Sequence, residues 1–203
     1  MNLSQVDIKL KGYTKEQIGK IGNTIIFLVK GIQPLYKTKL LKLIYLLDEL
    51  SIARNGIPFL GLDYKVWQAG PVCNDLYEEF NEYPYLLEGF IGLEHDHLGT
   101  RILAKKDFSD DEFSPLEIDL LNEIVKKYKT VSAEKLVELT HRKNSPWYIV
   151  ASENNLLDAF DNRRINTTDL QLDLSILIKD DPRKLALYKE HLEIDNFSKF
   201  LQP

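Results

Sequence analysis

The sequence is poor in cysteine: Cys73 is the single residue of this type among 203. One thiol cannot form an intramolecular disulfide, and it cannot supply the ligands of a cysteine-based zinc cluster. The composition, with 44% hydrophobic and 28% charged residues, is nevertheless that of a chain with its own hydrophobic core. A chain of this length is expected to form one domain.

Long hydrophobic runs are also missing. No stretch reaches the roughly 18 uninterrupted apolar residues that a membrane span needs. The first residues, MNLSQVDIKLKGYTKEQ, lack the apolar core of a secretory signal. We therefore expect a soluble, cytoplasmic protein that does not enter a membrane.

Positive charge is in deficit, with 26 Lys and Arg against 31 Asp and Glu and a formal net charge of −5. A protein whose main task is to neutralise nucleic-acid phosphates usually carries an excess of the opposite sign. The short basic segments 37–42 and 141–143 are predicted to be solvated helix faces or helix ends. Nucleic acid is therefore a disfavoured partner.

Recognisable catalytic signatures are absent as well. The sequence contains no P-loop, no dinucleotide-binding glycine pattern, no H-E-x-x-H and no G-x-S-x-G. In the segment EHDH, His95 and His97 stand two residues apart without a good third ligand nearby. We interpret this segment as a solvated turn, and we predict no catalytic residue, no metal site and no bound cofactor.

Helical patterns dominate what is present. Thr14 with Gln17 opens a helix over about 15–30, and Ser114 with Glu117 opens another around a proline at the first helical position. Further helices are predicted over about 37–56, from 74 toward Pro84, over 132–143, over 145–152 and from 182 toward 200. A β-hairpin is predicted within 89–106 and a strand over 170–178. The expected fold class is mainly α, an α+β arrangement in which a compact helical domain carries a small β-hairpin or short sheet.

The segment 37–56 has the pattern of a central, mostly buried helix. Apolar residues surround a narrow polar stripe at Lys42 and Glu49, and Asp48 falls on an apolar face. A carboxylate in that position must be paired or hydrogen-bonded, and His141 or a nearby lysine is its predicted partner. His141 itself is expected near a helix end, where an imidazole interacts well with exposed carbonyl groups.

The segment YKVWQAGPV, residues 64–72, joins strand-forming aromatic residues to a glycine–proline pair. It predicts a short edge strand that Gly70 and Pro71 convert into a helix start. Trp67 and Trp147 are expected to be core anchors, with an exposed interface position as the alternative for each, and the aromatic residues around this corner shift Trp67 toward an exposed groove. The predicted partner-binding surface consists of Tyr64, Trp67, Gln68, Gly70 and Pro71.

Four segments occur together in a fixed order: KLLKLIYLLDE (39–49), ARNGIPF (53–59), DYKVWQAGPVCNDLYEEF (63–80) and SAEKLVELTHRKNSPW (132–147). This ordered set resembles the Panacea domain, which is found in bacterial and phage toxin–antitoxin pairs. The matching positions are carried over as fold-defining positions and not as catalytic ones. They are Leu40, Leu43, Tyr45, Asp48, Gly56, Gly70, Pro71, Val72, Tyr77, His141 and Trp147.

The resemblance implies a mostly helical domain that acts as an antitoxin by binding and neutralising a cognate protein toxin. Family members share this domain while their toxins are unrelated, which implies that variable surfaces or appended segments select the toxin. We expect residues 1–152 to form the Panacea-like domain, including its N-terminal helix, and residues 153–203 to be a C-terminal extension packed on it. The sequence shows no helix-turn-helix beyond this domain, and it leaves homo-oligomer formation open.

Two alternatives to the antitoxin hypothesis remain. One is an enzyme with an unrecognised acid–base site built from Asp48, His141 and a neighbouring tyrosine. The other is a DNA-binding regulator that presents the helix 37–54 or the helix 132–143 to DNA. The net charge disfavours the regulator, and so does the expected burial of the first of these helices.

Overall fold

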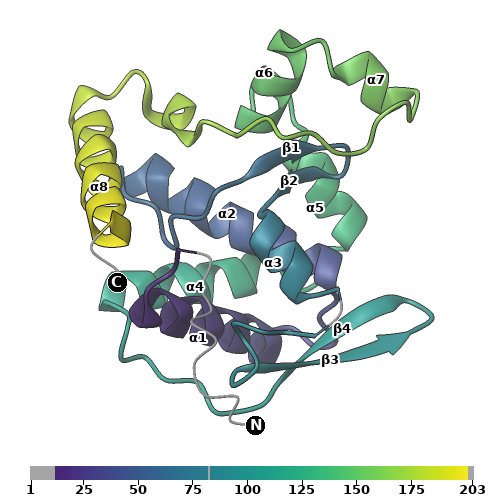
Figure 1. Ribbon diagram of the computed structural model, residues 1–203, viewed down its shortest axis with the longest axis vertical. Coiled ribbons are helices and arrows are strands. Elements are labelled where there is room, and N and C mark those ends of the chain that lie inside the picture. Colours follow the sequence, from purple (N-terminus) through teal and green to yellow (C-terminus); the bar gives the residue numbers. More distant parts are fainter. Residues whose placement is uncertain (1–11, 82, 201–203) are drawn as a thin grey trace, which may run out of the picture.

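A computed structural model describes residues 12–81 and 83–200, which fold mainly into α-helices with two small antiparallel sheets (Figure 1). The predicted fold class is therefore confirmed. The helices are α1 (Lys15–Gly31), α2 (Lys37–Asn55), α3 (Asn74–Glu79), α4 (Pro115–Tyr128), α5 (Ala133–Thr140), α6 (Pro146–Glu153), α7 (Leu157–Asp161), the 3-10 helix η1 (Leu174–Ile178) and α8 (Pro182–Phe200). The strands are β1 (Lys65–Trp67) paired with β2 (Gly70–Val72), and β3 (Ile91–Asp96) paired with β4 (Gly99–Ala104).

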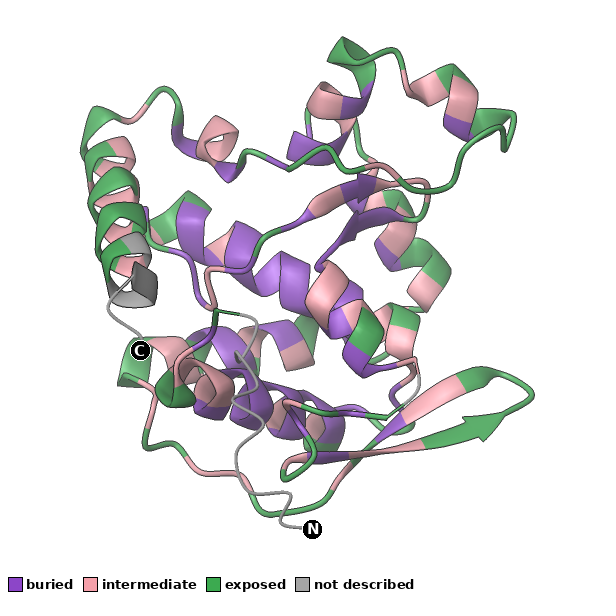
Figure 2. Cartoon of the chain, viewed as in Figure 1, coloured by how far each residue is buried: buried purple, intermediate pink, exposed green. Residues whose placement is uncertain are grey.

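Helix α2 runs through the centre of the molecule and is buried along most of its length (Figure 2). It contacts α4, α5, η1 and strand β2, as the prediction of a central helix requires. The predicted polar stripe is itself buried, since Lys42 is only 1% exposed and Glu49 only 8%. The helix ends at Gly56, whose φ of 75° is the left-handed conformation that glycine adopts without a Cβ clash.

Helices α1 and α4 pack against each other beside α2 (Figure 1). Both begin at the predicted capping boxes, in which Thr14 and Gln17, and Ser114 and Glu117, satisfy each other's free backbone N–H groups. Lys20 of α1 forms an ion pair with Glu117 of α4. Local sequence signals therefore decide where these two helices start.

Strands β3 and β4 form the hairpin predicted within 89–106, in register from Ile91↔Ala104 to Asp96↔Gly99. The Asp96 carboxylate closes the turn by accepting hydrogen bonds from the backbone amides of Leu98 and Gly99. The hairpin projects from the helical body (Figure 1).

The segment 64–72 forms a second β-hairpin, so the prediction that Gly70 and Pro71 convert a strand into a helix start is wrong. Strand β1 pairs with β2 from Lys65↔Val72 to Trp67↔Gly70, which leaves Gln68 and Ala69 as the turn. Gly70, with φ of 97°, follows this tight reversal of the chain. The glycine–proline pair thus belongs to the second strand, and α3 begins only after Cys73.

Residues 166–172 run along the other edge of β1, so β1 lies between β2 and this late segment of the chain. Three backbone hydrogen bonds join them, from Val66 N to Leu170 O at 3.0 Å, from Gln68 N to Asn166 O at 2.9 Å and from Leu172 N to Tyr64 O at 2.8 Å. Residues distant by about a hundred positions in sequence therefore flank the two-stranded sheet and occupy the free edge of β1.

The strand predicted over 170–178 is wrong, because this stretch forms only an isolated bridge, between Gln171 and Lys65, before it enters η1. The Asp173 carboxylate accepts a hydrogen bond of 2.8 Å from the backbone N of Ser175 and so caps η1. The alternating leucine and isoleucine residues then enter the core from a 3-10 turn, with Leu174 and Ile178 buried. Helix α8 begins at the predicted Pro182. Among the described residues, no helix combines the length and the apolar character that crossing a bilayer requires.

Truncation of a core side chain in α2 tests the central position of this helix. Leu43 is fully buried, and we expect Leu43→Ala to lower the free energy of unfolding by about 2–5 kcal/mol, because lost burial and a new cavity act together. Urea denaturation measures this change. Leu116→Ala on α4 is the matched control, since Leu116 is 57% exposed and should change stability by about 0.5 kcal/mol or less. Equal effects at both sites would contradict the central role of α2.

Candidate functional site

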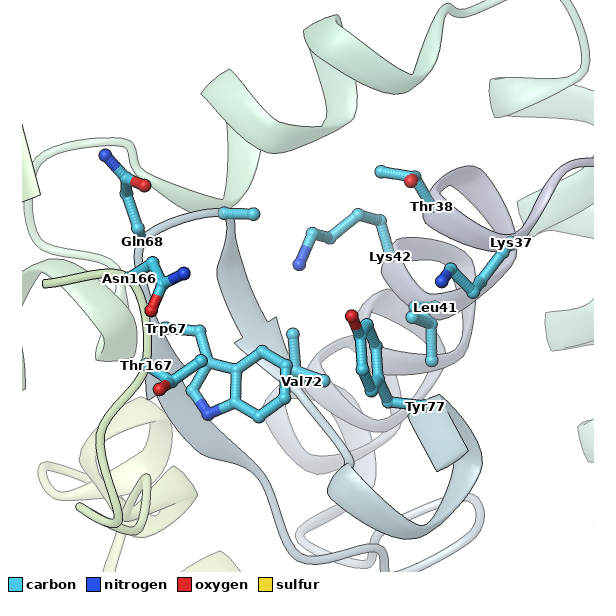
Figure 3. Close-up of a pocket in the computed structure, with 11 residues that line it drawn as sticks. Lys37, Thr38, Leu41, Lys42, Trp67, Gln68, Val72, Tyr77, Asn166 and Thr167 are labelled. Atoms are coloured by element: carbon cyan, nitrogen blue, oxygen red, sulfur yellow. The ribbon is translucent and has the colours of Figure 1, made fainter. Parts of the chain in front are cut away.

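A pocket of about 210 Å³ opens between α2, α3, the β1–β2 hairpin and the segment after α7 (Figure 3). The lining comes from three separate parts of the sequence, residues 37–42, 67–77 and 166–167, so the pocket exists only in the folded chain. Its lining includes Lys37 and Lys42 of α2, Trp67 and Gln68 of the hairpin, Tyr77 of α3 and Asn166.

Two aromatic rings form the walls of this pocket. The Trp67 and Tyr77 rings meet edge to face, with centroids 4.9 Å apart, which is a favourable geometry for aromatic pairs. The amino group of Lys37 lies 4.6 Å from the centre of the Tyr77 ring. The Trp67 indole N–H donates to Thr168 O at 3.2 Å, so the C-terminal segment holds this wall in place.

The amino group of Lys42 reaches from α2 toward the hairpin (Figure 3). It donates one hydrogen bond, to Pro71 O at 2.8 Å. A lysine ammonium has three N–H donors, and the described residues offer Lys42 no ion pair and no second hydrogen bond. Burial lowers the pKa of Lys42 to about 7, because desolvation penalises the charged form.

The carbonyl group of Pro71 is free to accept this bond because of the strand register. Pro71 lies opposite Val66, and the Val66 N–H points away from β2 to Leu170 O. In such a non-hydrogen-bonded pair, the N and C=O of the facing residue also point outward. On the outer strand β2 a proline therefore costs no ladder bond, and its carbonyl group faces Lys42.

Gly70 permits the close approach of three polar side chains. A Cβ atom at this position would lie 2.7 Å from Thr140 Oγ1, 3.2 Å from Lys42 Nζ and 3.4 Å from His141 Nε2. These atoms come from α2 and from the end of α5, and they converge on the backbone of the hairpin. Glycine is therefore required here both for its φ of 97° and for the absence of a side chain.

His141 ends helix α5, as predicted, but its imidazole does not bind helix carbonyl groups. The ring packs on Trp147 with centroids 3.8 Å apart, and its Nε2 is buried without a hydrogen-bond partner among the described residues. Burial, with the nearby charge of Lys42, lowers the pKa of His141 to about 4. The imidazole is therefore neutral at pH 7. Trp147 is buried, and its indole N–H donates to Trp67 O at 2.8 Å.

The predicted pairing of Asp48 with His141 or a lysine is wrong. The Asp48 carboxylate accepts hydrogen bonds from Tyr64 OH at 2.8 Å and from the backbone N of Leu60, Gly61 and Leu62 at 2.6, 3.3 and 3.4 Å. His141 lies instead near Lys42, six residues earlier on α2, or about 9 Å along the helix axis. The acid–base pair of the enzyme hypothesis is therefore not assembled. Burial raises the pKa of Asp48, against the opposing effect of its hydrogen bonds.

The predicted partner-binding residues fall into two groups. Trp67 and Gln68 line the pocket and are half-buried. Gly70 and Pro71 are buried next to Lys42, and Tyr64 is buried away from the pocket, against Tyr45. Tyr64 is held inside by its bond to Asp48. The structure thus brings Trp67 and Gln68 to a surface, leaves Gly70 and Pro71 as buried backbone beside Lys42, and places Tyr64 in the core.

Sequence reasoning missed Lys42, Tyr77 and Asn166 as members of the pocket. Lys42 carried a detectable signal, because a lysine on a helix that is apolar nearly all round cannot reach water easily. Asn166 had no detectable signal in the sequence, since only the tertiary fold places the C-terminal segment beside β1.

The remaining candidates for chemistry stay apart. His95 and His97 are exposed on the β3–β4 hairpin, and the described residues contain no group of three potential metal-ligating side chains. Cys73 is buried at the start of α3, and burial raises the pKa of its thiol to about 12. It is therefore not an activated nucleophile.

Substitution of Gly70 tests the close approach at the hairpin. We expect Gly70→Ala to destabilise the protein by about 1–3 kcal/mol, because it combines backbone strain with a clash against Thr140. Gly99→Ala is the matched control, since Gly99 also has a positive φ but no atom within 4 Å of the position that a Cβ would occupy. Thermal or urea unfolding should show the smaller loss for Gly99→Ala. If the Gly70→Ala protein were as stable as the Gly99→Ala protein, the proposed clash of a Cβ at position 70 with its neighbours would be contradicted.

The pH dependence of stability tests the burial of Lys42. An unfolded lysine keeps its proton up to about pH 10.5, whereas folded Lys42 releases it near 7. Between these values the unfolded chain binds more protons, so stability should rise with pH, by up to about 1.4 kcal/mol per pH unit. Urea unfolding at pH 7 and 9.5 should show this rise in the wild type and in Lys126→Met, an exposed control, and lose it in Lys42→Met. An unchanged slope in Lys42→Met would contradict the assignment.

Comparison with protein families matches residues 40–148 to the antitoxin SocA-like Panacea domain. The matched region runs from α2 to α6 and contains the hairpin, Lys42 and His141. Comparisons with curated proteins and with solved structures return no match. The matched region is just over half of the 203-residue chain, and the chain therefore belongs to the antitoxin SocA-like Panacea domain family.

Proposed function

We propose that the protein is the antitoxin of a toxin–antitoxin pair and that it neutralises its cognate toxin by direct binding. The observation that carries this proposal is the membership of residues 40–148 in an antitoxin family. Binding in place of catalysis is supported by the separation of Asp48 from His141, because the acid–base pair of the enzyme hypothesis is not assembled.

The toxin contacts the outer surface around the pocket, which we call the hairpin face. It consists of Trp67, Gln68, Ala69, Asn166 and Thr167, which are half-buried or exposed. Tryptophan is enriched among the residues that dominate binding energies at protein interfaces. A rigid support favours affinity, because little conformational freedom is lost on association. Here the indole N–H of Trp67 and the amide of Gln68 are already bonded to the chain's own carbonyl groups.

A DNA-binding role for α2 receives no support, because this helix lies in the core and has little surface to offer a groove. The net charge of −5 also disfavours binding to DNA. An acidic protein suits a toxin with a basic substrate-binding face, such as one that acts on RNA or nucleotides.

Co-expression tests this function. The reading frame next to the gene of this protein should arrest growth when expressed alone and be tolerated when this chain is present. Ala69→Arg should abolish the rescue, because it places a long charged side chain on the hairpin face at an exposed turn position without disturbing the core. Growth curves measure rescue, and co-purification of the two chains measures binding.

Ala186→Arg is the matched control, since it makes the same change at a position of α8 that lies away from the hairpin. It should rescue growth as well as the wild type does. If Ala186→Arg lost rescue while Ala69→Arg kept it, the toxin interface would lie on α8 and not on the hairpin face. A neighbouring product that is harmless alone would count against the antitoxin function itself.

A further inference from the structure

The pocket beneath the hairpin face contains a buried lysine amino group that has no anionic partner among the described residues. Lys42 is 1% exposed, and its one hydrogen bond goes to the neutral carbonyl group of Pro71. The two acidic residues of α2 are engaged elsewhere, Asp48 by Tyr64 and Glu49 by Arg142. A buried ammonium is costly unless it is paired, so an incoming anion would relieve this cost.

The size and lining of the pocket define the class of that anion. A volume of about 210 Å³ lies below the roughly 300 Å³ at which drug-sized ligand sites begin, so one short side chain fits better than a nucleotide. Apart from Lys42 and Lys37, the polar lining residues are neutral, among them Gln68 and Asn166. Arginine forks, which favour phosphate groups, do not line it. A carboxylate on a short aliphatic stem meets these conditions.

Three features place the carboxylate within the pocket. Lys42 lines the pocket and has unused N–H donors, the rings of Trp67 and Tyr77 form apolar walls for the stem, and Lys37 lines the pocket from the start of α2. Lys37 is already bonded to Asn81 at 2.7 Å, so Lys42 is the ammonium with donors to spare. His141 is neutral and adds no competing positive charge.

We propose that this pocket binds a carboxylate group through Lys42, and that in the antitoxin complex the carboxylate belongs to an acidic residue or the C-terminus of the toxin. The second part rests on the proposed function, whereas the first part does not. Binding would place an anchor of the toxin at the centre of the hairpin face, where contacts excluded from water dominate affinity.

The carboxylate site can be tested without the toxin. The full chain, labelled with 13C at lysine and 15N at tryptophan, is titrated with glutarate and, separately, with its neutral analogue glutaramide. Glutarate should shift the Lys42 Cε and Trp67 indole signals saturably, and glutaramide should not. Lys42→Met and Lys42→Gln should weaken the glutarate response of Trp67 at least about tenfold, with folding checked by circular dichroism.

Lys39→Met is the matched control for this titration. Lys39 lies on the same helix, but its amino group donates to Lys129 O outside the pocket, so this variant should bind glutarate as the wild type does. Glutarate binding that is unchanged in both Lys42 variants, or the absence of saturable binding, would overturn the site. Tighter binding of inorganic phosphate than of glutarate would overturn the assignment to carboxylates.

The source of the carboxylate is tested in the co-expression assay. Lys42→Met and Lys42→Gln should lose rescue, while Lys39→Met should keep it. Full rescue by folded Lys42 variants, together with glutarate binding in the wild type, would show that the bound carboxylate does not come from the toxin. The ligand of the pocket would then be a free carboxylic acid. Failure of the wild-type chain to rescue would overturn the proposed function alone, because the glutarate titration does not involve the toxin.

Discussion

The constraint on which this structure depends is the burial of α2 on nearly all sides. A helix in that position cannot pass its polar side chains to water, so each must find a partner within the fold. Asp48 holds the backbone of residues 60–62, Glu49 holds Arg142 near the end of α5, and Lys42 holds the carbonyl group of Pro71 in the hairpin. Three polar residues of one helix thus position three of the segments around it.

The three partnerships are not equally complete. Asp48 accepts four hydrogen bonds. Glu49 is paired with Arg142 through one carboxylate oxygen, while its other oxygen is buried without a hydrogen-bond partner among the described residues. Within the same part of the chain, Lys42 has a single neutral acceptor and no ion pair. Buried polar groups that are left incompletely satisfied weaken a fold, and natural proteins tolerate them mainly at functional sites. The position of Lys42 beneath Trp67 and beside an open pocket fits that pattern. The same helix therefore supplies both the stability of the core and the unusual electrostatics of the candidate site.

Much of the secondary structure was predictable because its signals are local. Helix starts are set by contacts within a few residues, namely the capping boxes at Thr14 and Ser114, the N-cap at Ser132 and the proline after Ser145. The errors arose where a distant segment decided the outcome. Gly70 and Pro71 form a strand because Lys42 and residues 166–172 surround the hairpin, and Asp48 bonds to Tyr64 because the loop of residues 60–62 folds back over α2. Neither arrangement follows from spacing along the chain.

The sequence by itself determined the mainly helical fold class, the central burial of α2 and membership in an antitoxin family. Helix periodicity, capping and an ordered set of motifs depend on residues that are close together in the sequence. Only the tertiary structure decided which side chains meet. It buried Tyr64, left Trp67 and Gln68 at a surface, separated Asp48 from His141 and brought Asn166 to a pocket above Lys42. The physical reason is that hydrogen bonding and desolvation depend on distances across the fold, which separation in sequence does not specify.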